Sequence, residues 1–242
     1  MDERRCHPPL IGHCYRTSGF TGTAGHRGTE QEFVSNVGEA MADRLRLQGV
    51  DAVTALADAS LPRCRLFVAL HQDGSVNPRA RGASVGYPSA HGPSRQAAQI
   101  WKAHYATTAG WPSGFRPDNY TRALRTYYGF RRIHADAKYL IEHGFATNRI
   151  DADYMWDNVG RIVKANCDAI VQWLGPPVEP YEEGLVDMET LVDTTTGEHW
   201  VCANGKARPL SNPDAWMASW VGPTRKSANM THVISDLYTV VG

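Results

Sequence analysis

The chain has 242 residues, which is enough for one medium-sized domain with a full core and a small appendage. Its 25 Lys and Arg residues balance its 25 Asp and Glu residues, so no overall positive field would draw it to nucleic acid or anionic lipid. The five cysteines are widely spaced and include no C-x-x-C pair, which favours a reducing cytosol over a disulfide framework or a zinc ribbon.

The N-terminal residues have no signal-peptide pattern. The opening Met1–Arg5 segment is charged, and His7 and two prolines follow it where a signal peptide would have an apolar region. No apolar run approaches membrane-spanning length. We therefore expect synthesis in the cytoplasm, no membrane insertion and no nucleic-acid partner.

The first predicted element in chain order is an amphipathic helix over residues 30–48. Its apolar residues recur at every fourth position, at Phe33, Val37, Met41 and Leu45. Gly49 is a stop signal. Thr29-x-x-Glu32 is a capping box, which places Thr29 at the helix start and engages Glu32 in the cap. Glu30 has no role in this cap, so its carboxylate is free for another function.

The rest of the first 175 residues alternates strands with helices. The patterns predict strands at 51–56, 65–71, 84–87 and 138–145 and helices at 93–105 and 158–174. This alternation predicts an α/β fold, a layered domain with a mainly parallel central sheet flanked by helices. Functional groups in such sheets gather at the carboxyl ends of strands. His71 ends one predicted strand, and Glu142 lies near the end of another.

Three segments carry metal-binding side chains that a purely structural pattern would not need, and they end in His13, Glu30 and His71. Two imidazoles and one carboxylate make a catalytic zinc set, which leaves a fourth position open to water. Zinc lowers the pKa of such a water towards about 7 and polarises a carbonyl group. Glu142, an acidic residue in an otherwise apolar strand, is costly to bury without a function and is the candidate general base and acid.

Several alternatives to this set are compatible with the sequence. His26 lies four residues before Glu30 and is the substitute for His13 as first ligand. A group of Cys6, Cys14 and nearby histidines is another metal site, although thiolates would make it a closed, structural one. His143 points to the opposite face of its strand from Glu142, so we expect an ordinary hydrogen-bonded histidine there.

The motifs in chain order resemble those of one enzyme family. They are Gly12-His13, Gly28-Thr29-Glu30, Leu70-His71 and the block from Leu140 to Asn148, with its Glu-x-Gly-Phe-x-x-Asn pattern. Together they resemble the zinc-dependent N-acetylmuramoyl-L-alanine amidases with a His, Glu, His ligand set, over residues 8–175. There are departures from the family pattern. Cys14 follows His13 where the family usually has Gly, and Gln-Asp-Gly follows His71 where the family usually has Ala-Asn-Ala.

The resemblance implies a bacteriolytic hydrolase that uses zinc to cut peptidoglycan between N-acetylmuramic acid and L-alanine. It implies that His13, Glu30 and His71 bind the metal and that Glu142 is the catalytic acid and base. Two other functions fit the same residues. One is a zinc peptidase or carboxypeptidase that cuts the stem peptide, and the other is a cell-wall-binding protein without turnover.

The Gly- and Pro-rich stretch that begins at Gly175 predicts a domain boundary. We expect a catalytic domain at 1–175, a linker at 176–183 and a small β-rich accessory module at 184–242. The module's tryptophans are more often core residues than sugar-binding ones, but attachment to a wall-cutting domain suggests contact with wall polymer. This arrangement resembles a bacteriophage endolysin, which waits in the host cytoplasm and reaches the wall when the membrane is permeabilised, so that cytolysis follows.

Overall fold

The computed structural model describes most residues up to 175 and five later strands. The described residues are 10–12, 22–56, 59, 63–175, 189–193, 199–203, 206–209, 224–227 and 239–240. Side chains are described between residues 22 and 175. The expected linker at 176–183 therefore lies outside the described residues, as do Cys6, His7, His13 and Cys14.

A five-stranded sheet forms the centre of the first part of the chain. Its strands are β1 (Leu10–Gly12), β2 (Val53–Ala55), β3 (Cys64–Asp73), β4 (Ser84–Gly86) and β5 (Ala135–Phe145), in the order β2-β1-β3-β5-β4. Every neighbouring pair is parallel except β4 with β5. The prediction of an α/β domain with a mainly parallel sheet is therefore confirmed.

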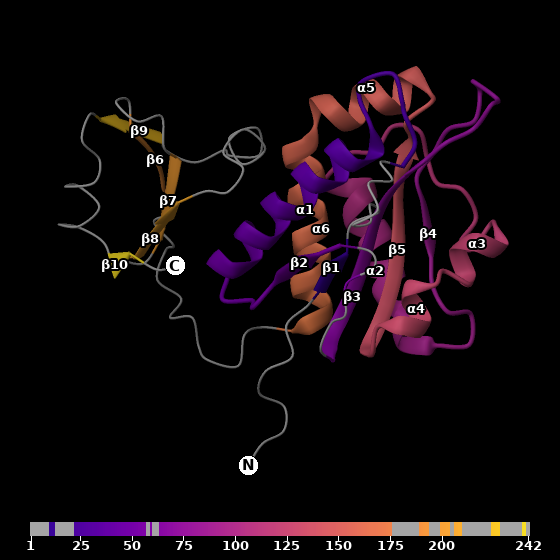
Figure 1. Cartoon of the computed structure of the whole chain (residues 1–242), viewed down its shortest axis with the longest axis horizontal. Helices are drawn as coiled ribbons and strands as arrows, with labels where there is room; N and C mark the ends of the chain where they lie inside the picture. Colours follow the sequence, from indigo (N-terminus) through magenta and orange to yellow (C-terminus); the bar gives the residue numbers. More distant parts are fainter. Residues whose placement is uncertain are drawn as a thin grey trace, which may run out of the picture.

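Helices cover both faces of this sheet (Figure 1). One face carries α1 (Glu30–Leu47), α2 (Gly92–Thr107) and α6 (Val159–Leu174), whose buried residues belong to the same core cluster as Leu66, Val68 and Leu70 of β3. The other face carries α3 (Arg122–Arg125) and α4 (Gly129–Arg132), which pack on Phe67 and Ala69 of the same strand. The period of two in β3 thus supplies both layers of the core, as expected for a strand buried on both faces.

The start of α1 follows the predicted capping box. Thr29 Oγ1 accepts a hydrogen bond from the Glu32 amide at 3.2 Å, and a Glu32 carboxylate oxygen accepts one from the Thr29 amide at 2.7 Å. In α2 the first turn contains Pro93, also as predicted. The sequence pattern did not predict α3 and α4, because each has only four residues and is too short to show a helical repeat.

A further helix that the sequence did not predict, α5 (Arg149–Asp157), follows β5 directly. Asn148 begins this helix by accepting hydrogen bonds from the amides of Ile150 at 3.1 Å and Asp151 at 3.2 Å. Asn148 ends the motif block that supported the family resemblance. In this structure its side chain caps a helix at the carboxyl end of β5.

The described strands after residue 188 form a second five-stranded sheet. They are β6 (Glu189–Asp193), β7 (His199–Ala203), β8 (Lys206–Pro209), β9 (Thr224–Ser227) and β10 (Thr239–Val240), in the order β10-β8-β7-β6-β9. The pairs β6 with β7 and β7 with β8 are antiparallel, and the two outer strands pair in parallel. Among the described residues, no helix combines the length and the hydropathy needed to cross a membrane.

Candidate functional site

Three of the four predicted site residues meet at the carboxyl edge of the central sheet. His71 and Glu142 are direct register partners in the parallel pair of β3 and β5, so their backbones are about 5 Å apart. Glu30, the first residue of α1, brings its Oε1 to 3.0 Å from His71 Nδ1. The fourth residue, His13, directly follows Gly12, which is the register partner of Ala69 in β3.

Glu30 is buried and held from several sides. Its Oε2 accepts a hydrogen bond from the Thr23 amide at 2.8 Å, and its Oε1 accepts one from the Gln72 amide at 3.2 Å. Burial opposes ionisation, but the hydrogen bond and charge of His71 and these two amides hold the pKa of Glu30 below its usual 4.5. Glu30 is therefore a fixed carboxylate at neutral pH.

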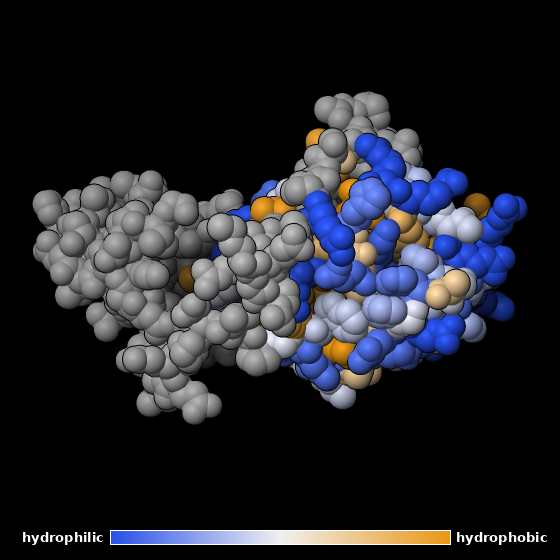
Figure 2. All heavy atoms as spheres, turned by 90° about the horizontal axis from the view of Figure 1, so that it is seen from below, coloured by the Kyte–Doolittle hydropathy of each residue, from blue (hydrophilic) through white to orange (hydrophobic). Residues whose placement is uncertain are grey.

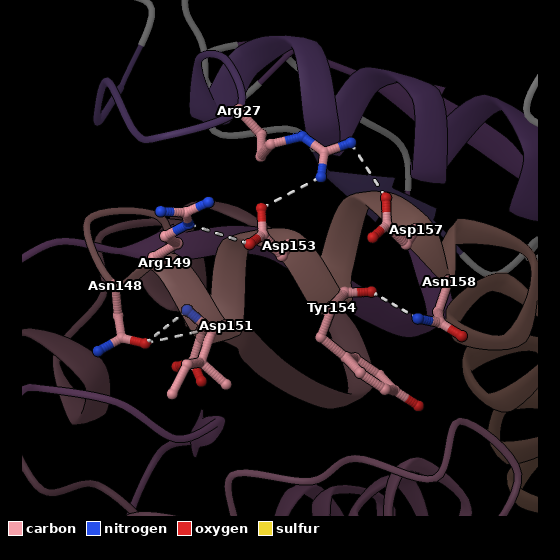
Figure 3. Close-up of polar contacts among 9 residues, drawn as sticks. Arg27, Asn148, Arg149, Asp151, Asp153, Tyr154, Asp157 and Asn158 are labelled. Atoms are coloured by element: carbon pink, nitrogen blue, oxygen red, sulfur yellow. Dashed lines mark hydrogen bonds and ion pairs between the residues drawn. The ribbon is translucent and has the colours of Figure 1, made fainter.

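The segment before α1 is fastened to α5 by Arg27 (Figure 3). Its guanidinium lies between two carboxylates of α5, at 3.1 Å from Asp153 and 3.0 Å from Asp157. Arg27 lies two residues before Thr29, where the capping box of α1 begins, so the chain is held on both sides of Gly28. Both anchors restrict where Glu30 lies at the helix start.

Glu142 is half-buried as a residue, but its Oε2 atom is buried and has no hydrogen-bond partner among the described residues. Burial, followed by the negative charges of Asp73 and Glu30, raises the pKa of Glu142 well above 4.5. The side chain lies on the same face of β5 as Leu140, which belongs to the core cluster under α3 and α4. A raised pKa makes this carboxylate a stronger proton acceptor, which suits a group that takes a proton and then returns it during a reaction.

Side chains that the sequence analysis did not single out complete the surroundings of this edge. The Tyr120 hydroxyl donates a hydrogen bond to Asp73, and the Arg116 guanidinium lies 4.4 Å from the centre of the Tyr120 ring. The Tyr127 ring packs edge-on against His71, with 5.4 Å between ring centres. Of these side chains, only Asp73 could have been singled out from the sequence, because it lies in the Gln-Asp-Gly that departs from the family pattern after His71. The segment from 116 to 127 has no periodic pattern that would place it beside β3.

His143 is the hydrogen-bonded histidine that the sequence predicted. Its Nδ1 donates to the His71 carbonyl at 3.1 Å, and its Nε2 accepts from the Asn166 side chain at 3.1 Å. Asn166 in turn accepts a hydrogen bond from the Trp101 indole at 2.8 Å. Burial lowers the pKa of His143 to about 4, so the ring is neutral at pH 7. This network holds the backbone of His71 from the face opposite the site.

His26, the alternative first ligand, lies elsewhere. It is exposed, and its Nε2 lies 3.1 Å from the carbonyl oxygen of Thr147. Within the ranges that the structure describes, no group of three or more His, Cys, Asp or Glu residues is arranged to hold a metal ion. The described side chains thus supply the His71–Glu30 pair and, on the neighbouring strand, the half-buried acid Glu142.

A mainly parallel sheet that carries a half-buried acid and a histidine–carboxylate pair at its carboxyl edge is typical of enzymes of the α/β class. The sequence profile of the N-acetylmuramoyl-L-alanine amidases matches residues 10–172. The chain belongs to this family, and it is a peptidoglycan hydrolase that cuts between N-acetylmuramic acid and L-alanine.

Solved structures of amidases have the same fold. The amidase AmiC2 of Nostoc punctiforme is 20% identical, with a TM-score of 0.53, and the match covers 69% of this chain and 97% of that one. Ami1 from Mycobacterium smegmatis is 19% identical, with a TM-score of 0.52 and coverage of 71% and 99%. The catalytic domain of the CD27L endolysin, which targets Clostridia difficile, is 18% identical, with a TM-score of 0.50 and coverage of 72% and 100%. No curated protein matches the chain.

Proposed function

We propose that this amidase depends on zinc, that His13, Glu30 and His71 bind the metal, and that Glu142 is the general acid and base. The observation that carries the proposal is the convergence of Glu30, His71 and Glu142 at one edge of the sheet from α1, β3 and β5. Glu30 and His71 are 41 positions apart in the sequence, so local structure alone does not require their side chains to be in contact.

The described residues fit a zinc ion in their chemistry. Imidazole nitrogen and carboxylate oxygen are both ordinary zinc ligands, and one of each lies here at a separation of 3.0 Å. His71 Nε2 is also buried without a hydrogen-bond partner in the described part of the chain. Zinc, when bound by such a set, lowers the pKa of water and polarises the scissile carbonyl.

The protein's own side chains then position and move the proton. Glu142 has a raised pKa, so its carboxyl can donate a proton to the amine of L-alanine as the amide bond breaks. His143 and Asn166 fix the His71 backbone from behind, and the amides of Thr23 and Gln72 fix the Glu30 carboxylate. The reacting groups therefore keep their positions without reorganising during the reaction.

The reaction is tested by digesting purified peptidoglycan with zinc-loaded wild type and with Glu142→Gln, followed by mass analysis of the released fragments. We expect wild type to release stem peptides that begin with L-alanine and Glu142→Gln to be about 10²- to 10⁴-fold slower, because general acid–base catalysis contributes that much. Glu39→Gln, an acidic residue of α1 outside the site, is the matched control. Fragments cut within the stem peptide would instead indicate a peptidase. Wall binding without any released fragment would indicate a binding protein.

The ligand set is tested by the metal content of the purified protein, which does not depend on activity. We expect about one zinc ion per wild-type chain and a clear loss in Glu30→Gln and His71→Gln. The pair His13→Ala and His26→Ala decides the first ligand, since only the true ligand will lower the zinc content. Full zinc occupancy in both Glu30→Gln and His71→Gln would refute this ligand set.

We further propose that residues 184–242 are an accessory module joined to the catalytic domain by residues 176–183, and that the protein is an endolysin. The second sheet of described strands supports a separate module, and the endolysin catalytic domain named above has the same fold as the first part of this chain. Expression in bacteria should cause lysis only after the membrane is permeabilised. Co-sedimentation of Glu142→Gln with walls, competed by soluble wall polymer, tests the contact with that polymer.

A further inference from the structure

A cavity of about 390 Å³ opens beside the site, on the face of the sheet that carries α3 and α4. Its lining residues include Arg122, Arg125 and Arg131 together with the aromatic residues Tyr127 and Phe130. The three arginines are exposed, whereas Phe130 is buried in the core cluster below. The cavity thus combines a cationic rim with an aromatic floor.

The charges of the rim have no partner among the described residues. None of the ion pairs or side-chain hydrogen bonds in that part of the chain involves the side chains of Arg122, Arg125 or Arg131. Carboxylates in the neighbouring segments pair elsewhere, Asp118 with Lys102 at 2.7 Å and Asp136 with Arg63 at 2.9 Å. In Figure 2, hydrophilic side chains gather at the end of the domain where Figure 1 places α3. A concave site with several guanidinium groups suits an anion that accepts paired hydrogen bonds.

Tyr127 connects this cavity to the reacting groups. The same ring that lines the cavity packs edge-on against His71, with 5.4 Å between ring centres. A bound peptide in extended conformation covers about 3.3 to 3.6 Å per residue. The second residue beyond a bond held at His71 and Glu142 would therefore lie about 7 Å from that bond. Since the ring centres of Tyr127 and His71 are 5.4 Å apart, this residue is within reach of the Tyr127 ring.

Resting on the proposed function, we propose that this cavity binds the stem peptide of the substrate, and that Arg122, Arg125 and Arg131 recognise its carboxylates. The main target is the free α-carboxylate of the second residue, a γ-linked D-glutamate that follows L-alanine. The aromatic floor formed by Tyr127 and Phe130 contacts the methylene groups of that residue. The cavity thereby selects stem peptides with an acidic second residue over those in which the same group is an amide.

The test compares two soluble muramoyl peptides that differ at one group, the α-carboxylate or the α-amide of the second residue. Hydrolysis of both is measured with zinc-loaded wild type, with the triple variant Arg122→Gln, Arg125→Gln, Arg131→Gln, and with the control Arg161→Gln. Arg161 is an exposed arginine of α6, on the opposite face of the sheet. Since hydrogen bonds to charged groups are the stronger ones, we expect kcat/KM of wild type to be about tenfold higher for the carboxylate.

The triple variant should lose this preference and the control should keep it. The preference should also weaken at high salt, because the arginines are exposed. Because the comparison of the two peptides with wild type needs no variant, it holds even if the triple variant folds poorly. Equal hydrolysis of both peptides by wild type, or a preference that persists in a folded triple variant, would overturn the inference and leave the amidase function intact. No hydrolysis of either peptide would overturn the proposed function and the inference with it.

Discussion

The buried His143 should make the stability of the fold around the central sheet depend on pH below neutrality. Its pKa is about 4 in the folded protein and 6.5 when unperturbed, so the unfolded chain takes up a proton between these values and the folded one does not. The stabilisation is therefore complete above pH 6.5 and is lost as the pH falls towards 4. For a fully buried group the loss is about 2 kcal/mol at pH 5 and about 3 kcal/mol at pH 4.

Urea unfolding of wild type and His143→Gln over this pH range measures the effect. The variant has no titrating group at this position, so its free energy of unfolding should fall less with pH, by the amounts given above. Other titrating groups, including Glu142, are common to both proteins and cancel in the difference. The two proteins could differ in stability at pH 7 without affecting this comparison. If their stabilities fell in parallel from pH 7 to pH 4, the assignment of His143 as a neutral, buried group would be refuted.

Two further predictions concern the supports of the site. Thr29→Ala removes the cap of α1 and should lower the free energy of unfolding by about 1 kcal/mol in urea titrations. An unchanged midpoint of the urea unfolding curve would contradict the role of the capping box. Asp151→Ala leaves the amides of Gly82 and Phe145 without their acceptor and should cost about 1 to 3 kcal/mol for each. The exposed Asp51→Ala is its control, and an equal effect of the two changes would refute the argument.

The amino-acid sequence was sufficient for those features that depend on local geometry. The capping box placed the start of α1 and left Glu30 free, because a helix leaves its first amides without partners and Thr29 supplies one acceptor. The period of two in a strand predicted that Glu142 and His143 point to opposite faces. The structure confirms that His143 lies in the helix-covered core, whereas the role of Glu142 stays a prediction.

Only the tertiary structure decided which residues surround the predicted site. Tyr120 donates to Asp73 across 47 positions of sequence, and Asn166 meets His143 across 23. The cavity lined by Arg122, Arg125 and Arg131 forms because the four-residue helices α3 and α4 pack on one face of the sheet. Such meetings depend on strand register and side-chain packing between distant segments, and no repeat along the sequence encodes them. Local geometry therefore determined where the elements begin and which way their residues face, and packing determined which of those residues meet.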